Sequence, residues 1–434
     1  MSTTTYFRKK LETLPREKLA AYQVERLRVL LKELHGKNRF YSKRLQAIGA
    51  APEDFTSVDS LSRFPFTTKA ELVADQTAIP PFGSNLTYPE KAYTRYHQTS
   101  GTTGASLRVL DTAESWDWWG KCWGYVLAGA GIIAEDRLFV AFGFGPFIGF
   151  WAAVEGARHV KSMMIPGGGR DSLQRLQLIR DSGCTALCAT PTYALRLAEV
   201  ARETHFDLRA LAVRTTIHAG EPGANVSSTK RRIEEAWGAK CYDHAGATEV
   251  GAHSFECQAQ PGGTHLNEAE FIAEVIDPET GQIVPTGTTG ELVLTNLGRF
   301  GFPVIRYRTG DMVVLTDERC SCGRTFVRCQ GGILGRYDDM FTVRGVNIYP
   351  GAVENLVRAV AEIDEFRVTV TRKGELDEMR IELECEEGSD TKAAAQKVVN
   401  AIRHRLGVRP VVEAVSRNTL PRFELKARRF KIIR

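Results

Sequence analysis

The sequence lacks the features of a membrane protein and of a secreted one. Its longest apolar run, from Leu138 to Val154, is interrupted by glycines and a proline and falls short of the about 20 residues that span a bilayer. The stretch from Met1 to Lys10 has no apolar segment between its charges and no cleavage site, which predicts that no secretory signal is present. We therefore expect a cytoplasmic protein that does not enter a membrane.

The chain also lacks a strong charge of either sign. Its 434 residues carry a net charge of +5 at pH 7, which suits anionic ligands but is far from the dense basic stripe of a nucleic-acid-binding protein. Hydrophobic residues make up 43% and charged residues 25%, as in ordinary globular proteins. We expect no nucleic-acid partner, and the length predicts two or more domains.

The nine cysteines indicate free thiols or a metal rather than a disulfide framework, because the chain is expected to be cytoplasmic. A Cys-x-Cys pair and an upstream Cys and His are the ingredients of a tetrahedral zinc site. The expected ligands are Cys257, His265, Cys320 and Cys322. Four unrelated side chains are the alternative, since the spacing is not that of a standard finger, and His253 and Cys329 are the substitutes if one ligand differs.

Strand-like apolar runs alternate with helical stretches between residues 115 and 290, which predicts an α/β fold on a parallel sheet. Shorter strand-like runs follow, as in a small barrel, and a separate small α+β unit begins near residue 345. The polar segment at Gly335 suits a hinge. We predict a large N-terminal domain at 1–335 and a small, mobile C-terminal domain at 336–434.

A loop of hydroxyl-bearing residues and glycines follows Thr99. Its glycines let backbone N–H groups approach an anion, and its Ser and Thr side chains add donors without charge, so the loop can wrap a phosphate. An ordinary solvated turn has the same composition, and the Gly-Lys-Ser/Thr ending of a Walker loop is missing. The loop residues are Ser100, Gly101, Thr102, Thr103 and Gly104.

Two further segments place acidic side chains next to strand-like runs. Thr248 and Glu249 follow the run that ends at Tyr242; such a Glu can hold Mg²⁺ on a nucleotide while the Thr bonds a phosphate oxygen. Asp311 follows a Thr-Gly pair, and its carboxylate can accept hydrogen bonds from two ribose hydroxyls. Each segment alone also fits a solvated turn. Lys426 offers a mobile cation near the C-terminus.

The order and spacing of these motifs resemble the adenylate-forming superfamily of acyl-CoA synthetases and adenylation domains, and more closely its phenylacetate-CoA ligase branch. The resemblance covers nearly the whole chain. The segments that carry it, in the family's order, are Arg63 to Lys69, Ser100 to Gly104, Ala219 to Pro222, Thr248-Glu249, Arg306 to Asp311 and Asp338 to Pro350.

The resemblance implies a two-step reaction with ATP, Mg²⁺ and CoA. An aromatic carboxylate attacks the α-phosphate of ATP and releases pyrophosphate, and the CoA thiol then captures the acyl-adenylate to give aryl-CoA and AMP. Charge that accumulates on the phosphates must be neutralised by the metal and a cation. Some members of the branch also carry a structural zinc ion, and a homodimer is compatible with the resemblance.

The resemblance also implies roles for individual residues. Glu249 is the implied Mg²⁺ ligand, Thr248 bonds the α-phosphate, and Lys426 bridges the carboxylate and the α-phosphate during adenylation. Asp311 holds the ribose, and Asp338 is the hinge of the C-terminal domain. The implied nucleotide-binding residues are Ser100, Gly101, Thr102, Thr103, Gly104, the adenine-flanking Glu221 and Pro222, and Asp243, Asp311 and Arg336.

Three positions depart from the pattern of the branch. Ala245 stands where a tyrosine stacks on adenine, Ala105 follows the glycine-rich loop in place of a lysine, and Leu425 precedes Lys426 in place of a glycine.

The aromatic and glycine-rich run from Phe142 to Phe147 is typical of a flat apolar slot and suits a planar aromatic acid. Each ring fits an ordinary core equally well. His244 and two further histidines lie nearby by motif position and favour a hydroxylated or amino-substituted ring, although a lone histidine is more often structural. The expected pocket residues are Phe142, Phe147, Ala153, His218, Ala245, Gly246 and His253.

The leading interpretation is an AMP-forming aryl-CoA ligase. A second interpretation keeps the adenylation and transfers the acyl group to an amine or to a carrier protein. A third is a non-catalytic nucleotide-binding protein, against which the intact Glu249, Asp311 and Lys426 argue.

Overall fold

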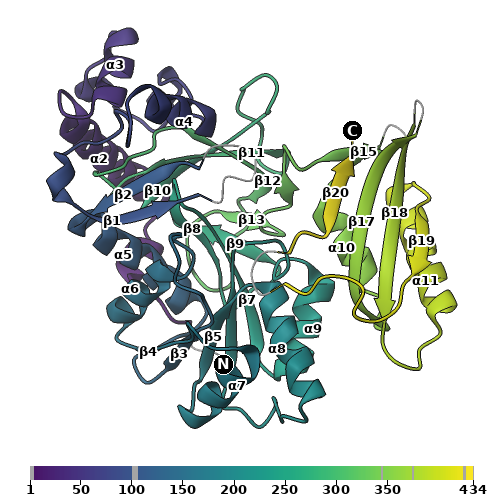
Figure 1. Cartoon of the computed structure of the whole chain (residues 1–434). Helices are drawn as coiled ribbons and strands as arrows, with labels where there is room; N and C mark the ends of the chain where they lie inside the picture. Colours follow the sequence, from purple (N-terminus) through teal and green to yellow (C-terminus); the bar gives the residue numbers. More distant parts are fainter. Residues whose placement is uncertain (1–3, 100–105, 344–345, 374–375, 424–426, 434) are drawn as a thin grey trace.

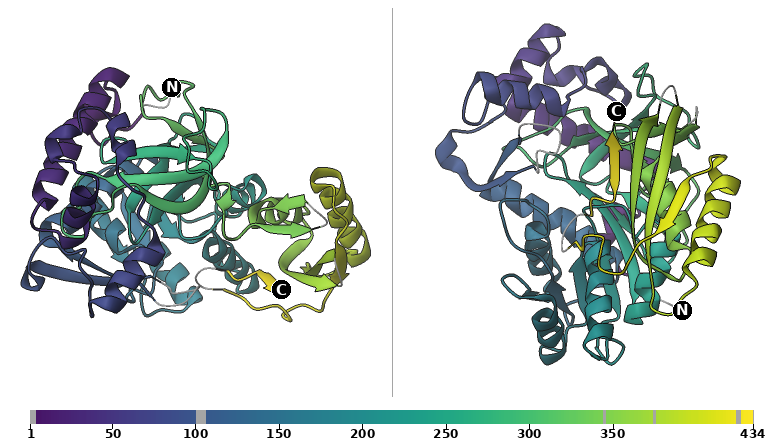
Figure 2. Two further views of the ribbon diagram at one scale, coloured as in Figure 1. Left: turned by 90° about the horizontal axis from the view of Figure 1, so that it is seen from above. Right: turned by 45° about the vertical axis from the view of Figure 1, so that its right-hand side comes forward.

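The computed structural model describes residues 4–99, 106–343, 346–373, 376–423 and 427–433. A large N-terminal part and a smaller C-terminal part lie side by side, and the C-terminal part projects from one flank (Figures 1 and 2). The α/β fold class that the sequence predicts is confirmed. No helix among the described residues is both long enough and apolar enough to cross a membrane.

One mixed sheet of twelve strands forms the centre of the N-terminal part. Its strands are β3 (Arg137–Val140), β4 (Met163–Pro166), β5 (Ala186–Ala189), β6 (Thr215–His218), β7 (Lys240–Ala247), β8 (Gly251–Glu256), β9 (Gly263–Leu266), β10 (Phe271–Ile276), β11 (Thr289–Asn296), β12 (Tyr307–Thr316), β13 (Arg328–Gln330) and β14 (Gly335–Arg336). The neighbours β7-β6-β5-β3-β4 are parallel, as predicted. From β7 to β8 the pairing turns antiparallel, so the strands predicted as barrel-like continue the same sheet.

Helices cover both faces of the parallel half (Figure 1). Successive residues of a strand point to opposite faces, and β5 shows this directly: Cys188 belongs to the core under α5 and α6, whereas Leu187 belongs to the core under α7, α8 and α9. The helices of the N-terminal part are α1 (Lys9–Glu12), α2 (Arg16–Leu34), α3 (Arg39–Ala47), α4 (Lys69–Ala78), α5 (Ala113–Gly129), α6 (Trp151–Val160), α7 (Ser172–Asp181), α8 (Pro191–Glu203) and α9 (Ser227–Trp237).

Local sequence fixes where α4 begins. The Thr68 hydroxyl accepts from the Glu71 N–H at 3.2 Å while the Glu71 carboxylate accepts from the Thr68 N–H at 2.8 Å, which is a capping box. The preceding Thr67 pairs with the start of β12 through backbone hydrogen bonds to Arg306 and Arg308, both 2.9 Å long. The first turn of α4 is therefore held beside β12.

The C-terminal part has a sheet and a hydrophobic core of its own. The sheet has the order β19-β18-β17-β20, and its core includes Phe341, Val357, Ile381 and Val398. Its elements are β15 (Phe341–Val343), β16 (Val346–Ile348), α10 (Pro350–Arg358), β17 (Ile363–Lys373), β18 (Leu376–Cys385), α11 (Thr391–Leu406), β19 (Val411–Ala414) and β20 (Phe430–Ile433).

A buried ion pair joins segments that are far apart in the chain. Asp111 lies on β2 (Arg108–Thr112), which pairs with β1 (Tyr93–Gln98), and its carboxylate accepts from Arg299 Nε and Nη2 at 2.7 Å each. Both side chains are 0% exposed. Arg299 Nη1 also donates to the backbone oxygens of Thr248 at 2.8 Å and Glu249 at 3.0 Å. The turn after β7 thus depends on this arginine.

Asp111→Ala removes one partner of this pair and leaves the Arg299 charge buried and unpaired. We expect the free energy of unfolding to fall by about 3–5 kcal/mol. Urea unfolding followed by tryptophan fluorescence measures this free energy for the N-terminal part, because all six tryptophans precede residue 240. Asp181→Ala is the control: its pair with Arg180 is exposed, so the change should stay below about 1 kcal/mol. Equal losses of stability in the two variants would contradict a stabilising role of the buried Arg299–Asp111 pair.

Candidate active site

The turn between β7 and β8 presents Thr248 and Glu249, the pair that the sequence predicts at the phosphates. The Glu249 side chain is only 7% exposed, and its Oε1 lies 3.2 Å from Lys69 Nζ and 3.3 Å from the Tyr307 hydroxyl. Burial and the neighbouring carboxylate of Glu249 raise the pKa of Tyr307, so its hydroxyl remains a donor. Both contacts use Oε1, which leaves Oε2 to serve as a ligand.

Lys69 and Tyr307 are site residues that the sequence reasoning did not single out. Lys69 is the first residue of α4 and Tyr307 the first of β12, and the backbone pairing of Thr67 brings these two ends together. The only sequence signal is that both lie in segments shared with the family's motifs.

Asp311, Arg336 and Asp338 also come together in the structure. Strand β14 pairs with β12 so that Arg336 lies opposite Asp311. The Arg336 guanidinium approaches Asp311 Oδ1 at 3.4 Å and binds both oxygens of Asp338 at 2.9 and 3.0 Å. One arginine therefore connects the residue predicted to hold a ribose with the residue predicted as the hinge.

Glu221 lies where the N-terminal and C-terminal parts meet. Its Oε1 accepts from the Thr192 N–H at the start of α8, 2.9 Å away, and its Oε2 accepts from the Ala427 N–H at 2.6 Å. Pro222 beside it is exposed. Ala427 directly follows Lys426 in the sequence.

Some predicted residues fall outside the part of the chain that the structure describes. They are Ser100, Gly101, Thr102, Thr103, Gly104 and Lys426.

Asp243 on β7 is half-buried, and its backbone N–H donates to the Glu256 carboxylate at 2.8 Å. Burial and the charge of Glu256 raise the pKa of Asp243 to about 7, although Lys230 opposes this shift. This carboxyl group changes charge near neutral pH.

Ion pairs hold the C-terminal part against α8. Arg422 lies 3.2 Å from Glu199 on α8, and Arg202, also on α8, lies 3.2 Å from Asp364 on β17. Arg429 is buried and donates to the Thr192 hydroxyl at 3.1 Å. A cavity of about 350 Å³ lies along this contact.

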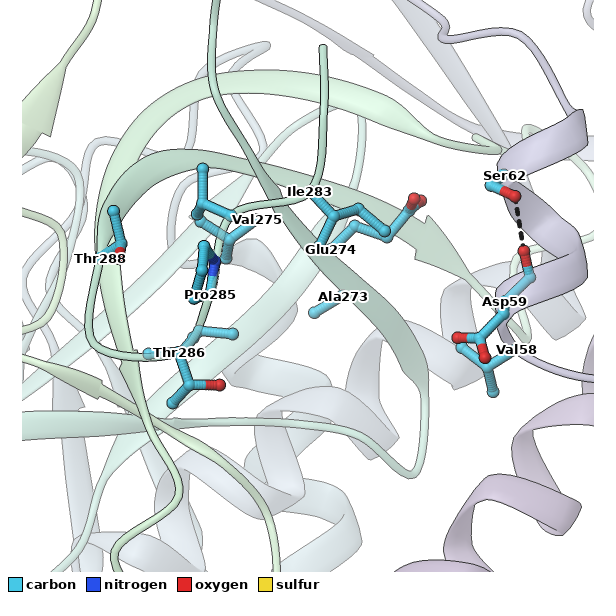
Figure 3. A pocket seen from close by; sticks show the side chains of 12 residues that line it. Val58, Asp59, Ser62, Ala273, Glu274, Val275, Ile283, Pro285, Thr286 and Thr288 are labelled. Carbon is cyan, nitrogen blue, oxygen red and sulfur yellow. Dashed lines mark hydrogen bonds between the residues drawn. The ribbon is translucent and has the colours of Figure 1, made fainter.

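A second cavity, of about 230 Å³, lies between β10 and the segment that precedes α4 (Figure 3). Val58, Glu274 and Ile283 line it. The sequence-predicted site residues that the structure describes are absent from its lining. It is therefore separate from the site around Glu249.

The predicted acyl-pocket residues lie after β3 and on α6. Phe142 is buried and meets Phe150 edge-on, with ring centroids 5.9 Å apart, and Ala153 on α6 is fully buried. Gly149 has a φ of +36°, and a Cβ there would come 2.3 Å from the Phe142 ring, so only glycine fits. Phe147 is 38% exposed.

The three histidines do not share one face of the sheet. His218 on β6 lies opposite Asp243, and its Nδ1 contacts the Ala189 oxygen at 3.0 Å. His244 follows Asp243 on β7 and therefore points to the other face, where its ring meets Trp123 of α5. His218 is thus on the side of α7, α8 and α9, away from Phe142. Ala245 and Gly246 follow at the end of β7 and are partly exposed.

The predicted zinc ligands converge although they come from distant segments. One ligand atom of each of the four lies within 4.8 Å of the others, and all four side chains are buried. His265 Nδ1 contacts the Phe326 oxygen at 3.1 Å, so its Nε2, 3.4 Å from Cys322 Sγ, faces the cluster. The set is Cys257, His265, Cys320 and Cys322, without the substitutes His253 and Cys329.

Comparison with known proteins defines the class. A family model described as "AMP-binding enzyme" matches residues 92–299, and one described as "AMP-binding enzyme C-terminal domain" matches residues 345–432. The chain belongs to the AMP-binding enzyme family, as the motif order predicts.

Within this family the chain belongs with the phenylacetate-coenzyme A ligases. That of Thermus thermophilus is 34% identical over 92% of this chain and 91% of its own length. That of Escherichia coli is 32% identical over 96% of this chain and 95% of its own length.

A solved relative shows two arrangements of the same enzyme. A 2-hydroxyisobutyryl-CoA ligase in its postadenylation state, in complex with 2-HIB-AMP, is 30% identical, covers 100% of this chain and 94% of its own, and has a TM-score of 0.94. In its thioesterification state, with CoA, it covers 100% and 93%, is 31% identical and has a TM-score of 0.75. The present structure is closer to the first arrangement.

Proposed function

We propose that this protein is an AMP-forming ligase that activates an aromatic carboxylic acid with ATP and transfers the acyl group to CoA, in the cytoplasm. The observation that carries the proposal is the grouping of Lys69 and Tyr307 around the Glu249 carboxylate after β7, with Asp311 and Arg336 paired on the neighbouring strands β12 and β14. The match to the AMP-binding enzyme family and the phenylacetate-coenzyme A ligase relatives support an aromatic acid as the substrate and the CoA thiol as the acceptor.

The described residues suit the charges of the first half-reaction. Asp311 would hold the ribose with Arg336 beside it, and the Thr248 hydroxyl would donate to the α-phosphate. Glu249 fits a Mg²⁺ ion, because its carboxylate is held in place at Oε1 and is available at Oε2. A bound Mg²⁺ supplies charge neutralisation at the phosphates. Lys69, next to Glu249, adds a cation at the same place, and Lys426 would bring another to the α-phosphate.

We also propose that the C-terminal domain, 336–434, turns about Asp338 relative to the domain at 1–335. The higher TM-score with the postadenylation state supports an arrangement suited to the first half-reaction. The carboxylate of Glu221 and the pair Arg422–Glu199 favour this arrangement, because both contacts cross between the domains.

We further propose that Cys257, His265, Cys320 and Cys322 hold a structural Zn²⁺ ion. Three thiols and an imidazole are a donor set that zinc prefers, and the hydrogen bond of His265 Nδ1 to a backbone oxygen orients Nε2 as the ligand atom. The Tyr6 hydroxyl donates to the Cys322 oxygen, so the N-terminal segment packs on the same cluster.

Purified protein should contain about one zinc ion per chain by elemental analysis, because the four ligands form a closed site. Cys320→Ser should lose most of the zinc and lower the melting temperature. Cys329→Ala is the matched control, since this buried thiol lies outside the ligand group and should keep the metal. Full zinc content in Cys320→Ser, or none in the wild type, would refute the site.

Pyrophosphate release tests the proposed reaction directly. With a panel of aryl and alkyl acids, release should require an acid and ATP, favour aromatic acids, and accelerate with CoA. Lys426→Ala should reduce release at least a hundredfold, because it removes the cation from the developing charge. Lys431→Ala, at an exposed lysine on β20, should leave release unchanged. Release indifferent to CoA would instead indicate an amine or a carrier protein as acceptor.

The domain arrangement can be tested through Glu199→Gln, which removes the charge pair of Arg422 with Glu199 and leaves Arg422 its bond to the buried Glu384. Loss of the pair with Glu199 should weaken this arrangement by about 1 kcal/mol, which corresponds to about a fivefold slower pyrophosphate release. Thioester formation from supplied acyl-adenylate should not slow. Arg417→Ala is the control, because the ion pairs of Arg417 among the described residues are with Asp364 and Glu387 of its own domain. Equal slowing of both half-reactions would count against the role of this pair.

A further inference from the structure

Three aromatic side chains near the Thr248–Glu249 turn carry ring nitrogens that can bind a ligand. Trp119 Nε1 and His253 Nδ1 are buried and have no hydrogen bond among the described residues. His244 is 5% exposed, and its recorded hydrogen bond, to the Ser254 oxygen at 2.7 Å, uses Nδ1 and leaves Nε2 unused. We call Trp119, His244 and His253 the polar cluster.

The polar cluster lies on one face of the sheet, the face covered by α5. His244 on β7 pairs with Phe255 on β8, and the ring of His253 meets Phe271, which belongs to the same core as Phe255, so both histidines lie on the side of that core. The Trp123 ring of α5 lies 4.6 Å from the His244 ring. Trp119 precedes Trp123 by one helical turn and shares its face.

The same cluster lies next to the reaction site. The Trp119 ring is 5.2 Å from the guanidinium carbon of Arg299, which binds the backbone oxygens of Thr248 and Glu249. The aromatic side chain of Phe150 packs on Trp123 and Phe142, with ring centroids 5.9 Å apart in each case. Aromatic rings and the ring nitrogens of the polar cluster therefore lie together beside the Thr248–Glu249 turn, which would hold the phosphates.

The hydrogen bonds fix what the polar cluster can accept. A backbone oxygen only accepts, so His244 Nδ1 carries the hydrogen and its Nε2 is an acceptor. Burial lowers the pKa of His244 to about 4 and that of His253 to about 3, so both rings are neutral at pH 7. The Trp119 indole nitrogen is a donor only. The cluster thus offers an acceptor at His244 and a donor at Trp119 on the same face of the sheet.

We propose that the polar cluster binds a hydroxyl or amino substituent of the acyl group, so that the preferred acids of this enzyme carry such a group. A hydroxyl or an amine donates to His244 Nε2, and a hydroxyl also accepts from Trp119 or His253. An unsubstituted ring would leave the buried Trp119 Nε1 and His253 Nδ1 unpaired, which disfavours its binding. The inference rests on the proposed function, because it names the acid for that same site.

Matched acids test this preference. Benzoate and phenylacetate would be compared with their 2-, 3- and 4-hydroxy, amino and methyl derivatives, with pyrophosphate release as the readout. The kcat/KM of the best hydroxy or amino acid should exceed that of both its unsubstituted and its methyl analogue at least tenfold. The methyl analogue separates hydrogen bonding from the mere filling of space.

Variants assign the preference to the cluster. His244→Phe keeps a ring but removes the acceptor, so the preference should fall at least fivefold through loss of activity on the substituted acid. A melting temperature close to that of the wild type shows that the variant folds. His244→Gln retains an acceptor and should keep part of the preference. His159→Phe, at a histidine that pairs with Asp117 outside the cluster, should leave the ratio unchanged.

Two results would overturn the inference. Equal activity on substituted and unsubstituted acids would show that ordered water satisfies the cluster, and a preference that survives in both His244→Phe and His253→Phe would place its origin elsewhere. Absence of pyrophosphate release with every acid is a different failure, because it would refute the proposed function itself.

Discussion

The buried pair of Arg299 and Asp111 is the contact on which the arrangement of the site depends. The guanidinium has five donors, and the structure uses them in two directions: two bonds neutralise the Asp111 carboxylate, and Nη1 holds the backbone of the Thr248–Glu249 turn. Because Asp111 fixes the Arg299 side chain and Arg299 in turn binds the turn, the backbone of the turn has little freedom. Glu249 can therefore remain at one place while its surroundings exchange ligands.

The contacts between the two domains have a different character. The pair of Arg422 and Glu199 is partly solvent-exposed, and Glu221 binds the backbone of Ala427 rather than a second charge. Such contacts are individually weak. The proposed rotation of the C-terminal domain between half-reactions needs contacts of this kind, whereas the turn that carries Glu249 needs the buried kind. The charged pair that holds the Thr248–Glu249 turn is thus buried, whereas the charged contacts between the domains are partly exposed.

The sequence predicts the parallel half of the sheet, the turn residues Thr248 and Glu249, and the grouping of the zinc ligands, because each depends on local pattern or motif order. It does not reveal Arg299 or Lys69 as site residues. Their partners are distant in sequence, and an arginine beside an apolar strand has no periodicity to mark it. The pairing of β6 with β7 places His218 opposite Asp243, the residue before His244. Because successive residues of a strand point to opposite faces, this pairing alone separates His218 from His244.

The polar cluster shows why specificity resists prediction from motifs. The motif positions indicate that His244 and His253 lie near the acyl group, but whether a histidine donates or accepts depends on its other ring nitrogen. Here the hydrogen bond of His244 Nδ1 to the Ser254 backbone oxygen determines that His244 Nε2 is an acceptor. A buried acceptor then discriminates against any acid that lacks a donor, and it does so more strongly than a change in apolar shape could. The proposed substrate preference would accordingly be set by a backbone contact on β8, outside every motif that identifies the family.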